Sequence, residues 1–91
     1  MSEEAENGKD NGNERNHGPQ PLDKIMTEMD MNSHALVAAS AQPMTHKAVV
    51  RARKGRQLTP KMKVRMTEAM NVFLRLKGEE TRYGVRDLFN Y

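Results

Sequence analysis

The chain has 91 residues, which is enough for one small domain, and its 15 Lys and Arg against 12 Asp and Glu give a formal net charge of +3. The absence of cysteine excludes disulfides and thiolate metal sites. No apolar run approaches the ~18 residues that a membrane-spanning helix needs. The acidic start is the reverse of a signal peptide, so we expect a cytoplasmic protein with no membrane partner.

The apolar residues favour helices over strands. Aromatic residues make up only 4% of the chain, whereas eight methionines accompany leucine, valine and alanine. Strands prefer β-branched and aromatic residues, so this composition is typical of small helical domains. We predict an all-α domain of four to five short helices.

Charge divides the chain into two regions. Residues 1–20 hold five acids and two bases, and they are too polar to bury a core, so we expect a disordered acidic tail. The tail either screens a basic surface of the same chain or only increases solubility. Residues 21–91 carry thirteen bases and seven acids, and from Thr45 to Arg65 there are eight Lys or Arg residues and no acid.

The first helix is expected to begin at Pro21, because proline suits the first helical position. Leu22, Ile25, Met26 and Met29 then recur at the spacing of one helix face. These four residues predict one side of a small core.

A second helix is expected after Asn32, whose side chain can accept a hydrogen bond from the first turn. Leu36 and Val37 would point inward. Pro43 cannot continue a helix, so this one should end before it.

The third helix is the most basic element. Thr45 would cap it, residues 46–54 would form it, and Gly55 would end it in a left-handed conformation. Val49 and Ala52 form its apolar stripe. Its other residues are mainly polar or basic.

The fourth helix would begin with Thr59 as cap and Pro60 at the first position. Its bases Lys61, Lys63 and Arg65 lie near the N-terminus, where the helix dipole disfavours cations. A phosphate backbone, unlike a purely structural role, favours positive charge there. The predicted core face of this helix is Met62, Met66, Ala69, Met70 and Phe73.

The last segment, residues 78–91, is more polar and ends in apolar residues. We expect an extended stretch through Tyr83 and a short helix over Val85–Phe89. The C-terminal residues Tyr83, Leu88, Phe89 and Tyr91 would either cover the small core or form a dimer contact.

Residues 22–75 resemble the helix-turn-helix domain of the lambda-repressor and Cro family. The turn "SAQPMT" is about two residues longer than that of the family, and Arg53 stands where the family commonly has an acid. The matching positions are Asn32, Leu36 and Val37 in the second helix, Thr45, Val49, Ala52 and Gly55 around the third, and Thr59 to Asn71 in the fourth.

The resemblance implies a lambda-repressor-like helix-turn-helix domain over residues 21–77, with residues 78–91 as a C-terminal extension. The helix Thr45–Lys54 would then enter the major groove of duplex DNA. Residues that would face base edges are His46, Lys47 and Val50. Residues that would lie near phosphates are Thr45, Arg51, Lys54, Arg56, Lys61 and Lys63.

The implied role is transcription regulation in a bacterium or its phage. A homodimer would place two half-sites about 10 bp apart. Two alternatives remain open: a protein-interaction adaptor whose basic face holds an acidic partner, and RNA binding.

The sequence contains no pattern typical of a catalytic site or a metal site. The three histidines, at 17, 34 and 46, form no ligand pair at helical spacing, so we expect no metal site. Nucleophile motifs and phosphate-binding loops are also missing, and we therefore expect a non-enzyme with no cofactor and no small-molecule substrate.

Overall fold

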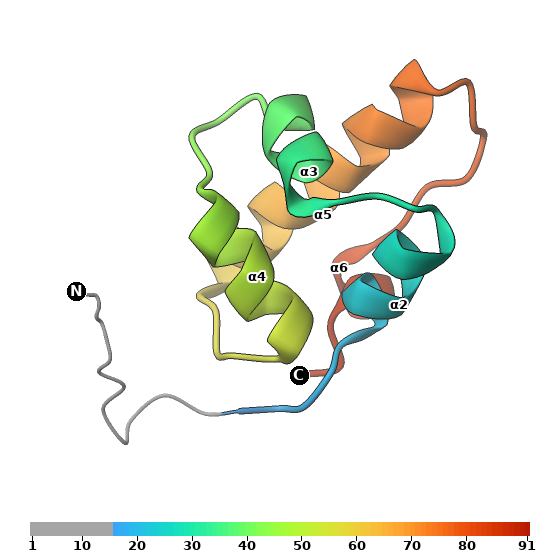
Figure 1. Cartoon of the computed structure of the whole chain (residues 1–91). Helices are drawn as coiled ribbons and strands as arrows, with labels where there is room; N and C mark the ends of the chain where they lie inside the picture. Colours follow the sequence, from blue (N-terminus) through green and yellow to red (C-terminus); the bar gives the residue numbers. More distant parts are fainter. Residues whose placement is uncertain (1–15) are drawn as a thin grey trace.

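The computed structural model describes residues 16–91, which form five helices and one isolated β-bridge (Figure 1). The prediction of an all-α chain is confirmed for this range. None of these helices is long and apolar enough to cross a lipid bilayer. The helices are α2 (Pro21–Glu28), α3 (Ser33–Ala39), α4 (His46–Lys54), α5 (Pro60–Leu76) and α6 (Val85–Leu88).

Three helices begin at the capping residues that the sequence indicated. In each, a side-chain oxygen accepts a hydrogen bond from a main-chain N–H three residues further on, a contact that typically contributes about 1 kcal/mol. The pairs are Asn32 with Ala35 (2.9 Å), Thr45 with Ala48 (3.0 Å) and Thr59 with Met62 (3.1 Å). Helix α4 ends, as predicted, at Gly55 in the left-handed region.

The helices share one core. Helix α3 contacts α4 and α5, while α2 contacts α4 and α6, and α6 also contacts α5. The predicted apolar face of α5 is confirmed, with Met62 and Phe73 at its partly buried edge. Side chains with no solvent exposure come from all five helices: Leu22, Met26, Leu36, Val49, Ala52, Met66, Met70 and Leu88.

The C-terminal segment packs on the same core. Leu88 is fully buried and Phe89 is only 2% exposed. The Asn71 side chain clamps the main chain before α6, because its amide donates to the Tyr83 carbonyl (2.9 Å) and accepts from the Tyr83 N–H (2.8 Å). The predicted short helix is therefore present, one residue shorter than expected, and its apolar residues cover the core.

Residues 16–20 also belong to the folded part. The His17 N–H donates to the Gly55 carbonyl (2.7 Å). Gln20 is 2% exposed, and its side-chain oxygen accepts from the Asn90 N–H (2.8 Å). The predicted tail boundary after residue 20 is therefore too late, because these contacts join both ends of the described chain. Residues 1–15 of the predicted tail lie outside the described range.

Candidate nucleic-acid interface

Helix α4 has one buried side and one exposed side. Val49 and Ala52 have no solvent exposure and face the core. His46, Val50 and Lys54 are exposed and follow one another at intervals of four residues, so they lie along one face. Val50 is 41% exposed. We call this surface the α4 face.

The other predicted contact residues on or next to α4 lie beside this face. Lys47 is exposed and Arg51 is half-buried, and both positions flank the line of exposed residues. Thr45 precedes the helix and is exposed, although its hydroxyl oxygen serves as the cap. Arg56, beyond the end of α4, is half-buried, and its main chain forms the β-bridge with Asn16.

Arg53 points away from this face, toward α2. Its Nε lies 2.5 Å from Oδ1 of Asp23, and its Nη2 donates to the hydroxyl of Thr27 (3.2 Å). Arg53 therefore connects α4 to α2.

The bases at the start of α5 have separate environments. Lys61 is exposed. Lys63 was predicted to contact phosphate, but its ammonium donates to the main-chain oxygen of Tyr91 (2.8 Å). The same ammonium lies 4.3 Å from the centre of the Tyr91 ring. Arg65 donates to the carbonyl of Pro43 (2.9 Å). Lys61 is thus the base of this turn whose position agrees best with the predicted phosphate contact.

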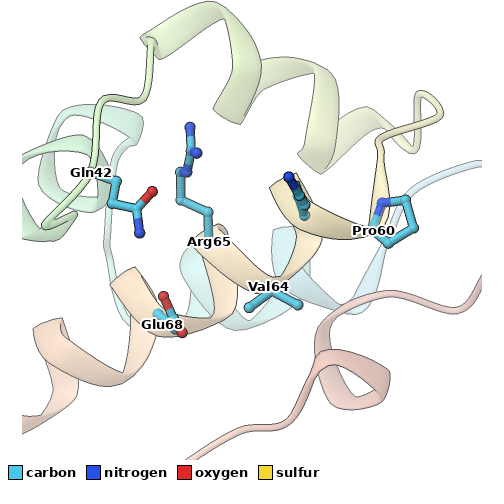
Figure 2. Close-up of a pocket in the computed structure, with 6 residues that line it drawn as sticks. Gln42, Pro60, Val64, Arg65 and Glu68 are labelled. Atoms are coloured by element: carbon cyan, nitrogen blue, oxygen red, sulfur yellow. The ribbon is translucent and has the colours of Figure 1, made fainter.

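An open hollow of about 480 Å³ lies between residues 41–43 and the first half of α5 (Figure 2). Figure 2 shows Arg65 reaching from α5 toward the segment that carries Gln42. The lining combines both signs of charge with the half-exposed Val64, and it consists of Gln42, Pro60, Lys61, Val64, Arg65 and Glu68. The mixed lining does not specify one class of ligand.

Tyr91 organises the turn between α4 and α5. Its hydroxyl accepts from the Leu58 N–H and donates to the Arg56 carbonyl, both at 3.1 Å. The ring of His17 stacks on it with the centroids 3.9 Å apart. Partial burial raises the pKa of the Tyr91 hydroxyl, and the hydrogen bond from Leu58 opposes that rise.

One pair of side chains near the α4 face was missed by the sequence analysis. His34, the second residue of α3, and His46, the first of α4, approach with Nδ1 of His34 3.3 Å from Nε2 of His46. They are twelve residues apart, and α3–α4 packing brings them together. Helical spacing within one element therefore could not have revealed this pair.

Among residues 16–91, no group of three or more His, Cys, Asp or Glu side chains is placed to hold a metal ion. Comparisons with known protein families, with curated proteins and with solved structures gave no match.

Proposed function

We propose that this chain binds duplex DNA through the α4 face, as a small transcription regulator with a lambda-repressor-like helix-turn-helix domain. The observation that carries the proposal is the division of α4 into a fully buried side and an exposed side that bears His46, Val50 and Lys54. The sequence from Thr45 to Arg65 contains no acid that would repel phosphate.

The dimensions of α4 suit the major groove. An α-helix with its side chains is about 10–12 Å across, and the major groove of B-DNA is about 12 Å wide and admits a helix. His46 and Lys47, in its first turn, would donate to O6 or N7 of guanine. Val50, one turn later, would contact a thymine methyl group.

Phosphate contacts would come from residues at the border of the α4 face. The Thr45 hydroxyl accepts from Ala48, and its own proton is left to donate to a phosphate oxygen. Lys63 is not included among the proposed phosphate contacts, because its ammonium donates to the main-chain oxygen of Tyr91. The remaining proposed phosphate residues are Thr45, Arg51, Lys54, Arg56 and Lys61.

The burial of the aromatic residues favours duplex DNA over single-stranded RNA as the ligand. Single-stranded binders stack bases on exposed rings. All four Phe and Tyr residues lie in the described range, where Phe89 is buried and Phe73, Tyr83 and Tyr91 are half-buried. This distribution supports groove binding. We propose no catalytic role.

The test is the salt dependence of affinity for a duplex selected from a random pool. Each neutralised phosphate contributes about 0.9 to the slope of log K against log salt. Lys54→Ala should therefore flatten the slope by about 0.9. Arg75→Ala removes the same charge from the C-terminal end of α5, which lies across the molecule from α4 (Figure 1), and should leave it unchanged. Equal slopes for the wild type and Lys54→Ala would overturn this assignment.

A further inference from the structure

Two exposed imidazole rings meet where the beginning of α3 approaches the beginning of α4. Nδ1 of His34 lies 3.3 Å from Nε2 of His46, and the ring centres are 5.3 Å apart with the planes tilted by 32°. The two nitrogens are within reach of a hydrogen bond from one ring to the other, and its direction depends on the tautomer of each ring.

The spacing matches that of two ligands on one metal ion. Imidazole nitrogens bind Zn²⁺ at about 2.0–2.1 Å, so two of them on a tetrahedral ion lie about 3.3–3.4 Å apart. If both rings point at the ion, the same geometry places the ring centres about 5.2–5.3 Å apart. Both distances in the structure agree with these values.

We propose that His34 and His46 bind one divalent transition-metal ion of the Zn²⁺ class, through Nδ1 of His34 and Nε2 of His46. Imidazole suits Zn²⁺, Ni²⁺ and Cu²⁺, and among these Cu²⁺ should bind most tightly. Within residues 16–91 these two histidines are the ligands of the proposed site, because no group of three potential ligands occurs in this range. The site is open and binds more weakly than a closed four-ligand site.

The fold holds both ligands in place before the ion arrives. His34 comes two residues after the Asn32 cap, and His46 directly follows the Thr45 cap. Packing of α3 against α4 fixes the distance between the two helix starts, so little further ordering is needed. The helix dipoles oppose a cation at these N-termini, and the affinity therefore comes from the two nitrogen lone pairs.

The bound ion would also affect the α4 face. It occupies Nε2 of His46, one of the two ring nitrogens with which this residue would contact guanine, and this consequence rests on the proposed function. Metal binding and guanine recognition by this atom then exclude each other. The metal site itself does not depend on DNA binding, so the two are tested separately.

The experiment uses the full chain without DNA. Thermal unfolding is followed by circular dichroism in EDTA and with zinc at about ten times its dissociation constant. The expected result is a rise of at least about 4 °C in Tm, because the ion binds the native state. His34→Gln and His46→Gln should each abolish the rise. His17→Gln is the matched control and should retain it, since His17 stacks on Tyr91 instead.

A second measurement locates the ion even if a variant unfolds. In an NMR titration of the wild type, ring resonances of His34 and His46 should move together and saturate at one ion per chain, while those of His17 stay in place. A Tm rise that survives in both His34→Gln and His46→Gln would overturn the proposal. Ring resonances that do not respond at millimolar zinc would overturn it as well.

Discussion

Arg53 on α4 and Asp23 on α2 form an ion pair, with Nε 2.5 Å from Oδ1. The two residues are thirty positions apart, and the pair joins a basic helix to the first helix of the described chain. Lys54, the residue after Arg53, is exposed on the α4 face. Adjacent bases of the same helix thus have different environments, so we expect one to affect stability and the other to affect the proposed DNA binding.

Replacing Arg53 with Ala should lower the free energy of unfolding by about 1 kcal/mol, because the ion pair and the bond to Thr27 are lost at a partly exposed position. Lys54→Ala should change stability by less than about 0.5 kcal/mol and weaken DNA binding instead. Urea unfolding and DNA titration of both variants measure the two effects. If Lys54→Ala lowered the free energy of unfolding more than Arg53→Ala does, the assignment of Arg53 to stability and Lys54 to DNA binding would be refuted.

Replacing Gly55 with Ala should destabilise the protein by more than about 2 kcal/mol. Its φ is 89°, and an added Cβ would lie 1.7 Å from the carbonyl oxygen of Gly18. The left-handed backbone alone costs about 1–2 kcal/mol. Gly78→Ala is the control, because its φ is 80° and nothing lies within 4 Å of the added atom. Equal losses in urea unfolding would show that residues 16–20 do not pack against the end of α4.

Replacing Tyr91 with Phe should cost about 1 kcal/mol at neutral pH, because the Leu58 N–H and the Arg56 carbonyl lose a partner. Burial raises the pKa of Tyr91 in the native state. The unfolded chain then loses this proton first as the pH rises, and stability falls above about pH 10. The Phe variant lacks this contribution to the fall.

The check is urea unfolding between neutral pH and pH 11 for the wild type, Tyr91→Phe and Tyr83→Phe. Tyr83 is the matched control, because its main chain rather than its hydroxyl holds the bonds to Asn71. A pH slope that is the same in the wild type and in Tyr91→Phe would contradict the burial argument.

Replacing Lys47 with Ala should cost about 1–3 kcal/mol on a selected DNA site and relax the preference at one base pair, because a base contact is lost. Lys54→Ala should weaken specific and random DNA equally, since phosphate contacts carry no sequence information. Competition binding with selected and scrambled duplexes distinguishes the two. Equal losses on both duplexes for Lys47→Ala would remove Lys47 from the base-reading set.

The helices were predictable because their signals are local. Thr45 and Thr59 accept hydrogen bonds from residues only three positions away, so a cap and the apolar spacing behind it are visible in one short stretch. The buried side of α4 follows from the same periodicity, and so does the exposure of His46, Val50 and Lys54.

Pairings between distant residues were not predictable. Gln20 meets Asn90, and Lys63 meets Tyr91, only after the ends of the chain have packed together. Sequence charge placed Lys63 among the predicted phosphate-contacting residues and gave no sign of its contact with Tyr91. It also left Gln20 in the tail, because an isolated polar residue gives no sign that it will be buried.

The central claim is that the α4 face contacts duplex DNA, and an NMR titration of ¹⁵N-labelled protein with a mixed-sequence duplex tests it most directly. At low salt, we expect backbone amide shifts concentrated at residues 45–56 and at Lys61, which weaken at moderate salt. Amides at the C-terminal end of α5 should not move. Unchanged amides in residues 45–56 at low salt would contradict the account, and so would shifts centred on another surface.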